Sequence, residues 1–347
     1  MSEPFRFTSG PRDAKIVLVG EGWGEQEEFV GLPFVGSSGQ ELTKLLREAG
    51  IPRSECLLTN ALALRPPSGN VDLLCVSKTE VGKTYQLPAM KQGKYLKWEF
   101  LPELIRLGEE LAHAPRNLVV ALGNTACWSL LGTSGISSLR GTVAESTLVP
   151  GLKVLPTYHP SAILRQWALR PIVLADLMKA KREMVFPEIR RPHRTVLVNP
   201  TIEEIIEWTS RPAEAYAVDI ETASKQITCI GFARSPSDAL VIPFWDKTRP
   251  DWSYWGHEHE LVAWRLVQDL LECPIPKIFQ NGLYDLQYLV RMGFRPRACI
   301  HDTMLMHHAM YPELQKGLGF LGSIYSNEVA WKLMNRKRAD EVEKKDE

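Results

Sequence analysis

KIVLVG, residues Lys15 to Gly20, is an apolar run that ends in glycine and precedes the polar Glu21. Helical patterns at 39–49 and 101–112 alternate with three comparable apolar runs: LLTNALAL (57–64), NLVVALG (117–123) and KVLPT (153–157). Short apolar strands that alternate with helices predict a parallel sheet covered on both faces, a three-layer α/β/α domain. In such sheets, ligands bind where the strands end at their carboxyl edge.

The chain has 347 residues, which is too long for one ordinary core and predicts two domains of about 150–200 residues each. A helix expected over 171–184 precedes FPEIRRP, in which two prolines and three charges indicate a linker. We therefore expect a first domain over 1–186, a linker over 187–194 and a second domain over 195–347.

The second domain begins with a different pattern. A strand, TVLVN, comes first and an amphipathic helix over 200–209 follows it. Three β-rich runs come next, at 215–221, 227–233 and 239–244. Antiparallel strands that continue into helices predict a mixed α/β fold.

Charge and cysteine content restrict the classes of protein. Lys plus Arg and Asp plus Glu both number 41, so the net charge is zero, but basic residues dominate from Lys153 to Arg194. Such a stretch can contact phosphates or form a solvated helix face. The six cysteines are scattered without a C-x-x-C pair, as in a reducing compartment. The chain has neither a signal peptide nor an apolar run of membrane length, so we expect a cytoplasmic protein with no membrane partner.

Three strand ends of the first domain carry polar residues, namely Glu21, Asn60 and His159. The glycines at 20, 22 and 24 have the wrong spacing for a dinucleotide loop, and the acidic residues after them would repel a pyrophosphate. The segment from Pro66 to Lys97 has no clear periodicity, and we interpret it as an inserted surface excursion.

Five ordered blocks over roughly 150 residues make the pattern specific. They are GEGWGEQEEFVGLPFVGSSGQEL (20–42), LLTNALALRPP (57–67), LVVALGNTA (118–126), ISSLRGT (136–142) and LPTYHPSAILR (155–165). Together they resemble family 4 of the uracil-DNA glycosylase superfamily. The resemblance implies excision of uracil from DNA by base flipping, which needs an aromatic face, a hydrogen-bonding amide and stabilisation of developing charge.

The resemblance also implies a role for each matching residue. Glu21 positions water or stabilises the sugar, Phe34 stacks on the extruded uracil, Asn60 reads the Watson–Crick edge of the base, and His159 stabilises the leaving group. Glu27 crowds the C5 position of uracil, while Leu164 and Arg165 wedge into the vacated stack and hold the backbone.

Family 4 enzymes typically bind a [4Fe-4S] cluster through four cysteines. Here no cysteine precedes Cys56, and Leu64 and Phe100 occupy the places of two of the ligands. With the thiolates absent, we expect no iron–sulfur cluster.

The second domain offers carboxylates of another kind. Asp219 and Glu221 share one face of an expected strand, and Asp285 follows some sixty residues later in QNGLYD. Carboxylates that converge from separate segments suit Mg²⁺ or Mn²⁺. The blocks AVDIET (217–222), FQNGLYDLQYL (279–289) and HDTMLMHHAMYPELQKGLGFLGSIY (301–325) resemble the proofreading 3′-5′ exonuclease domain of family A DNA polymerases, especially those of phages. That resemblance implies an RNase H-like fold with these three carboxylates as metal ligands.

One exonuclease motif is missing, because no Y-x-x-x-D pattern follows Tyr325. We therefore expect an incomplete exonuclease module in a protein of a bacterial or phage-infected cell. Two alternatives to a uracil-excising enzyme stay open. The chain is either a DNA-tethering module for a separate DNA polymerase chain, or an exonuclease whose missing aspartate is supplied in trans. Asp302, in a D-T dipeptide, is expected to be structural.

Overall fold

The computed structural model describes residues 3–298 and 300–326, which form two compact units. Among these residues, unit 1 comprises 3–190 together with 319–326, and unit 2 comprises 191–318. Residues 319–326 therefore belong to unit 1, whereas the sequence led us to expect everything from residue 195 onward in one second domain. None of the described helices is long and apolar enough to cross a membrane.

Unit 1 is built on a five-stranded sheet in the order β2-β1-β5-β7-β6. Four strands are parallel, and the short β6 pairs antiparallel with β7. The strands are β1 (Ile16–Gly20), β2 (Cys56–Asn60), β5 (Leu118–Leu122), β6 (Ala144–Glu145) and β7 (Lys153–Thr157). Every residue of the four parallel strands is buried, which explains their continuous apolar runs. The expected parallel-rich α/β chain is confirmed.

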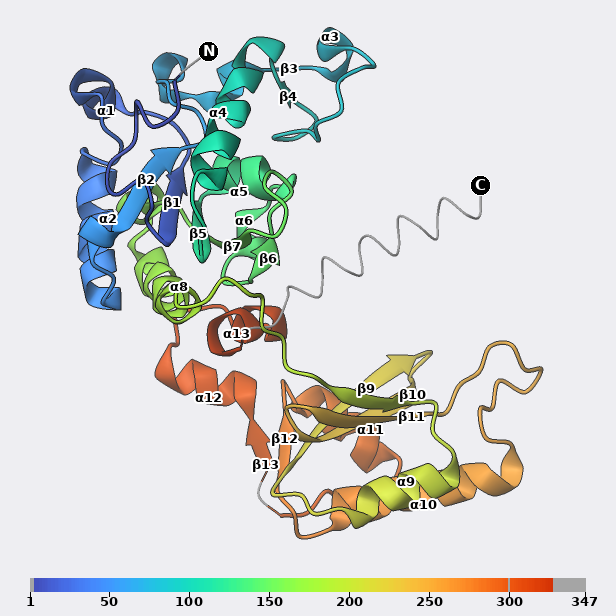
Figure 1. The fold of residues 1–347 in the computed structure, drawn as a ribbon. Helices are drawn as coiled ribbons and strands as arrows, with labels where there is room; N and C mark the ends of the chain where they lie inside the picture. Colours follow the sequence, from blue (N-terminus) through green and yellow to red (C-terminus); the bar gives the residue numbers. More distant parts are fainter. Residues whose placement is uncertain (1–2, 299, 327–347) are drawn as a thin grey trace. The chain divides into compact units, whose positions relative to one another are not determined.

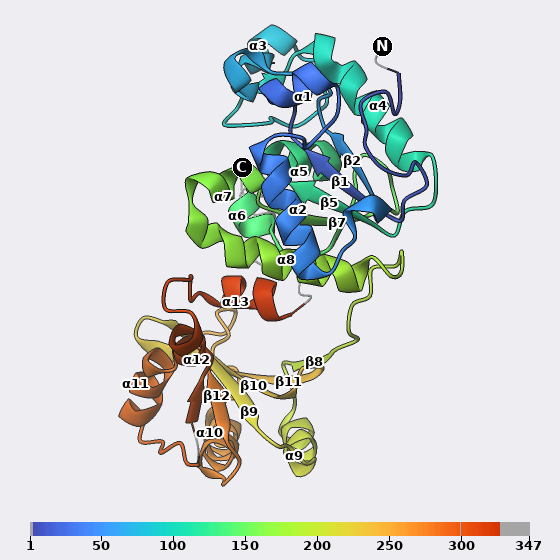
Figure 2. The ribbon, with the colours of Figure 1, turned by 90° about the vertical axis from the view of Figure 1, so that its left-hand side faces the viewer.

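Helices cover both faces of this sheet (Figures 1 and 2). One core contains residues of α4 (Leu101–Ala112) and α5 (Asn124–Leu131), and the other contains residues of α2 (Ser37–Ala49) and α8 (Arg170–Glu183). The remaining helices of unit 1 are α1 (Glu25–Val30), α3 (Lys78–Val81), α6 (Ile136–Leu139), α7 (Pro160–Arg165) and α13 (Leu318–Tyr325).

Two segments differ from the pattern in the sequence. The apolar run expected to extend to residue 64 leaves the sheet after Asn60. The amides of Ala61 and Leu62 then donate hydrogen bonds to the carbonyls of Gly20 and Glu21. The excursion at 66–97 contains α3 and a hairpin of β3 (Cys75–Val76) and β4 (Tyr95–Leu96), and its apolar residues reach the core.

Unit 2 contains a mixed six-stranded sheet in the order β13-β12-β9-β10-β11-β8. The central strands β9, β10 and β11 are antiparallel, and the outer pairings are parallel. The strands are β8 (Thr195–Val198), β9 (Tyr216–Ala223), β10 (Gln226–Ser235), β11 (Asp238–Pro243), β12 (Lys277–Phe279) and β13 (Ile300–Asp302). Its helices are α9 (Ile202–Ser210), α10 (His257–Glu272), α11 (Leu283–Arg291) and α12 (Thr303–Met310).

The basic stretch from Lys153 to Arg194 is partly internal. The ammonium of Lys153 is buried and donates to Glu183 Oε2 at 3.0 Å and to the carbonyl of Phe186 at 2.7 Å. Arg170 pairs with Glu41 and Glu48. These cations therefore stabilise the fold, so the charge count overstated the surface available for phosphates.

Candidate active site

A cleft of about 790 Å³ opens at the carboxyl edge of the parallel sheet in unit 1. Its walls contain six of the seven residues predicted for the first site: Glu21, Glu27, Phe34, Asn60, His159 and Arg165. The seventh, Leu164, does not line the cleft and is 49% exposed on α7. The parallel strands thus bring together side chains from residues 21 to 165, as expected for this kind of sheet.

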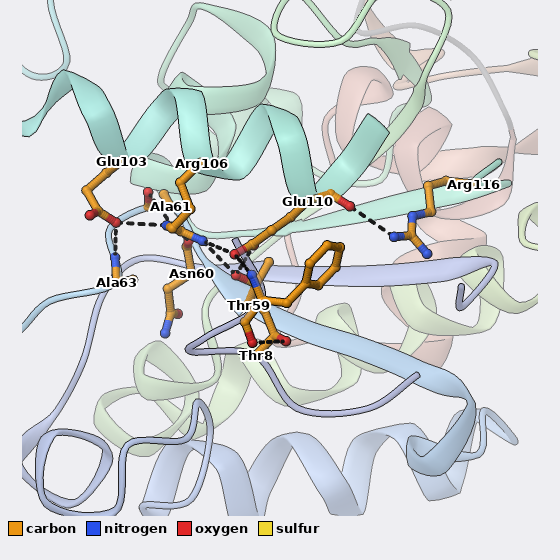
Figure 3. Close-up of polar contacts among 10 residues, drawn as sticks. Thr8, Thr59, Asn60, Ala61, Ala63, Glu103, Arg106, Glu110 and Arg116 are labelled. Atoms are coloured by element: carbon orange, nitrogen blue, oxygen red, sulfur yellow. Dashed lines mark hydrogen bonds and ion pairs between the residues drawn. The ribbon is translucent and has the colours of Figure 1, made fainter. Parts of the chain in front are cut away.

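Asn60 is the last residue of β2, and a buried network behind the strand fixes its backbone. Arg106 Nη2 donates to the Asn60 carbonyl at 2.7 Å and to the Ala61 carbonyl at 3.3 Å. The Asn60 amide points away from this network (Figure 3) and reaches the cleft. The amide is therefore free to bind a ligand while its backbone is held in place.

The Arg106 network continues along α4 (Figure 3). Arg106 donates from Nη1 to Glu110 Oε1 at 2.7 Å and from Nε to Glu103 Oε2 at 2.9 Å. Glu110 also accepts from the Thr59 hydroxyl at 2.8 Å, and Glu103 accepts from the Ala63 amide at 2.8 Å. Because Arg106 and Glu110 are almost fully buried, their charges need these partners.

Phe34 adopts a strained backbone conformation beside Asn60. Its φ of 57° lies in the left-handed region, which is uncommon for a bulky residue. Arg53 Nη2 donates to its carbonyl at 3.0 Å, which helps to hold this conformation. Gly20 makes room for the ring, since a Cβ there would lie 2.6 Å from Phe34 Cζ and would overlap the Asn60 amide oxygen.

Glu27 and Glu21 are both held by neighbours. Glu27 Oε1 accepts from the amides of Val35 at 3.1 Å and Gly36 at 2.8 Å, so this buried carboxylate anchors the loop that carries Phe34. The resemblance implied a role for Glu27 in substrate selection and did not predict this anchoring role. Glu21 Oε2 accepts from the Thr125 hydroxyl at 2.5 Å, which orients its carboxylate at the N-terminus of α5.

His159 is the N-cap residue of α7, and its ring stacks near Phe34 with 6.0 Å between centroids. The Ser161 amide donates to Nδ1 at 3.2 Å, which assigns the ring proton of the neutral form to Nε2. Burial, with a smaller contribution from Arg165, lowers the pKa of His159 to about 4. At neutral pH the ring is therefore an uncharged donor.

The family match covers this unit. Residues 7–183, just over half of the chain, match the uracil DNA glycosylase superfamily. The chain belongs to the uracil DNA glycosylase superfamily. It is an enzyme of a class that hydrolyses N-glycosyl bonds.

Two relatives are type-4 uracil-DNA glycosylases. The Thermotoga maritima protein is 33% identical over 174 residues, which cover 50% of this chain and 79% of the relative. The Archaeoglobus fulgidus protein is 32% identical over 176 residues, which cover 49% of this chain and 77% of the relative. Among solved structures, Escherichia coli RNase D, an exoribonuclease, covers 40% of this chain and 34% of its own, with 14% identity and a TM-score of 0.28. That similarity is too low to support an argument about the fold.

The glycosylase unit does not fit an iron–sulfur cluster at the positions that the resemblance indicates. Leu64 and Phe100 pack against the hydrophobic core there. The described cysteines of this unit, Cys56, Cys75 and Cys127, are free thiols, and burial raises the pKa of Cys56 and Cys127 to about 12. Apolar side chains at two of the indicated positions leave no set of four thiolates there to bind the cluster.

Sequence reasoning missed two parts of the glycosylase cleft. One is Arg106 with its acidic neighbours, which the charges on the otherwise apolar face of α4 could have revealed. The other is the excursion at 66–97, which contributes Asn70, Lys91 and Gln92 to the wall. No signal in the sequence connected that segment with the strand ends.

The second predicted set lies in unit 2, where Asp219 and Glu221 are exposed on the same face of β9. Burial and the charge of Glu221 raise the pKa of Asp219. Asp285 is buried on α11, and its Oδ1 accepts from the Ile220 amide at 3.1 Å. Mainly because of burial, the pKa of Asp285 rises to about 6. The three carboxylates are thus neighbours, but within 3–298 and 300–326 no group of three or more His, Cys, Asp or Glu is arranged to hold a metal ion.

Asp302 has a clear structural role. It is the N-cap residue of α12 and accepts from the Met304 amide at 2.8 Å. Its second oxygen accepts from the Gly282 amide at 2.7 Å, which fixes the turn before α11. The candidate positions after residue 326 for a further carboxylate, including Asp340, lie outside the described residues.

Proposed function

We propose that unit 1 excises uracil from DNA after the nucleotide has flipped into the cleft. The observation that carries this proposal is the convergence of an aromatic ring, a buried amide and an uncharged histidine donor at one sheet edge. Membership of the glycosylase superfamily and the names of the type-4 relatives support uracil as the substrate.

The proposed chemistry assigns one task to each side chain. Phe34 stacks on the flipped base, and the Asn60 amide hydrogen-bonds its Watson–Crick edge. As the bond between C1′ and N1 breaks, His159 donates from Nε2 to the uracil oxygen on which negative charge develops. Water adds to C1′, with Glu21 orienting it or stabilising the positive sugar, and its proton balances the departing uracil anion.

Contacts with the flanking DNA follow from the rim of the same cleft. Arg165 and Lys91 line it and are suited to bind phosphates. The exposed Leu164 lies beside Arg165 on α7 and is suited to wedge into the space that the base vacates. We propose that this reaction needs neither a metal ion nor an iron–sulfur cluster, because side chains and backbone dipoles stabilise the charges.

For unit 2 we propose an RNase H-like, exonuclease-like module of the kind found in phage-type DNA polymerases. The support is the sequence pattern around Asp219, Glu221 and Asp285, which would hold Mg²⁺ or Mn²⁺ if the site is functional. A second candidate function for the whole chain is DNA tethering for a separate polymerase chain, acting in the cytoplasm of a bacterial or phage-infected cell.

One experiment tests the leading proposal. The purified full chain is incubated with single- and double-stranded oligonucleotides that contain one uracil, with and without EDTA, and alkali-labile sites are counted. We expect abasic sites at the uracil in both conditions and none in a matched thymine oligonucleotide. Abasic sites that disappear completely in EDTA would contradict the metal-free mechanism, and a protein that binds this DNA without releasing uracil would favour tethering.

A further inference from the structure

The last described helix, α13, belongs to the glycosylase unit although it follows unit 2 in the sequence. The chain leaves unit 1 after Arg190 and returns to it at Gly319. Both views show α13 beside α8 (Figures 1 and 2). The helix lies outside residues 7–183 that match the superfamily, so the relatives give it no role.

Lys179 of α8 binds the C-terminal end of this helix. Its ammonium is buried and donates to the carbonyls of Ser323 at 2.7 Å, Ser326 at 2.6 Å and Gly141 at 2.6 Å. The last carbonyls of a helix lack partners within the helix, and the negative end of its dipole favours a cation. Each of the three protons of the ammonium therefore has an acceptor, and two of those acceptors belong to α13 and to the residue directly after it.

Arg140 makes the second connection. Its Nη1 donates to the Ser323 hydroxyl at 2.6 Å, and its guanidinium lies 5.5 Å from the centre of the Phe320 ring. The same guanidinium forms a buried ion pair with Asp176. Asp176 in turn accepts from the Thr157 hydroxyl at 2.7 Å. A continuous set of contacts thus runs from α13 to Thr157, the last residue of β7.

Gly141 shows that the sequence makes room for this helix. Its φ is 72°, in the region that favours glycine, and an added Cβ would lie 2.8 Å from both the Ser323 carbonyl oxygen and Asp176 Oδ1. Any side chain at position 141 would collide with the backbone of α13 and with the Asp176 carboxylate, so one of the two would have to move away. The glycine therefore permits the close approach that the hydrogen bonds of Lys179 require.

The end of β7 reached by these contacts is tightly packed beside the cleft. The Gly123 amide donates to the Thr157 carbonyl at 2.9 Å, and a Cβ on Gly123 would lie 3.1 Å from the Cβ of His159. His159 follows Thr157 by two residues. A small shift of Thr157 would consequently move the histidine relative to a bound base.

We propose that α13 completes the glycosylase unit, and that Arg140, Asp176 and Lys179 are positioning residues that connect this helix to the strand end carrying His159. This inference rests on the proposed uracil excision. It predicts that residues of α13 influence the catalytic rate of the glycosylase. These residues lie beyond the family-matched region, and the chain of unit 2 separates them from the rest of unit 1 in the sequence.

The test uses point variants of the full chain. Lys179→Met removes all three hydrogen bonds, Ser323→Ala removes only the hydroxyl that Arg140 binds, and Lys181→Met on the exposed side of α8 is the control. We expect Lys179→Met to lower kcat roughly tenfold with KM nearly unchanged, since small displacements of a catalytic group are costly. Ser323→Ala should lower kcat about threefold, and the Lys181 variant should match the wild type.

Circular dichroism and histidine NMR separate positioning from loss of fold. At a temperature where each variant is fully folded, the resonance of His159 should shift in Lys179→Met and Ser323→Ala but not in Lys181→Met. Folded variants with unchanged kcat and an unchanged His159 resonance would overturn the inference. If Lys179→Met fails to fold, the kcat and the His159 resonance of Ser323→Ala test the inference by the same two criteria. A wild-type chain that releases no uracil refutes the proposed function instead, while the His159 resonance still reports on the connection to α13.

Discussion

The two units present the polar side chains of their sheets in opposite ways. In unit 1, Asn60, Glu21 and His159 are each oriented by a neighbouring group, and the histidine is uncharged. In unit 2, Asp219 and Glu221 carry like charges on one exposed face, and their repulsion contributes to the raised pKa of Asp219. The first arrangement is preorganised to stabilise charge that develops in a reaction, whereas the second concentrates negative charge on one face of a strand.

The comparison is tested most strongly by removing the amide of unit 1. Asn60→Ala should reduce kcat/KM for uracil excision by on the order of 10³-fold, because a pocket built to hydrogen-bond a base edge would no longer orient the base. Steady-state kinetics on a uracil oligonucleotide measure this effect. Asn117→Ala is the matched control, because Asn117 directly precedes β5 at the edge of the sheet opposite to the cleft. A loss below tenfold would show that Asn60 does not read the base.

His159→Ala should reduce kcat by about 10²-fold and affect DNA binding much less, since its hydrogen bond strengthens only as charge develops. Single-turnover rates and binding of an uncleavable analogue separate the two effects. His113→Ala, elsewhere in unit 1, serves as control. Equal losses in binding and turnover would remove the special role of His159.

Arg106→Met tests whether the buried network around Arg106 stabilises the strand end that carries Asn60. The variant leaves Glu110 buried without its main partner, which should cost about 3–5 kcal/mol of unfolding free energy. Denaturant unfolding followed by circular dichroism measures this cost, with the exposed Arg47→Met as control. A change below 1 kcal/mol would mean that water or rearrangement satisfies Glu110.

For unit 2 we expect little or no 3′-5′ trimming by this chain, even with Mg²⁺ or Mn²⁺. The reason is that two-metal hydrolysis needs ions held roughly 3.5–4 Å apart, and the described carboxylates do not form such a group. Asp219→Ala should also leave uracil excision within about twofold of the wild type, because the proposed chemistry of unit 1 uses side chains of unit 1 and no cation. Robust metal-dependent trimming that Asp219→Ala abolishes would reverse this assignment.

The smallest expected effect is a dependence of stability on pH. His159 has a folded pKa of about 4 against an ordinary 6.5, so only the unfolded chain gains its proton between these values. The neutral His159 therefore costs the folded state no stability above pH 6.5. As the pH falls toward 4, protonation of the unfolded chain lowers the free energy of unfolding. Thermal unfolding at pH 7 and pH 5 should show a smaller drop in Tm for His159→Gln than for the wild type. Equal drops would indicate that His159 is already protonated in the folded state.

The layers of unit 1 and several residues that line its cleft could be predicted from the sequence alone. Apolar runs such as Lys15 to Gly20 identify buried parallel strands because burial on both faces leaves no room for polar residues. The carboxyl ends of parallel strands meet at one edge, so polar residues directly after them converge. Glu21, Asn60 and His159 could therefore be grouped before any coordinates were known.

Only the tertiary structure decided which charged residues support the cleft. Lys153 and Lys179 belong to a stretch that looked like a surface for phosphates, yet both are buried and bind carbonyls or carboxylates. Arg106 reaches the Asn60 carbonyl from a helix more than forty residues later, and α13 returns to unit 1 after all of unit 2. Local periodicity reports which face of an element is buried, but the partner of a buried charge is set by contacts between distant segments. Those contacts exist only once the chain has folded.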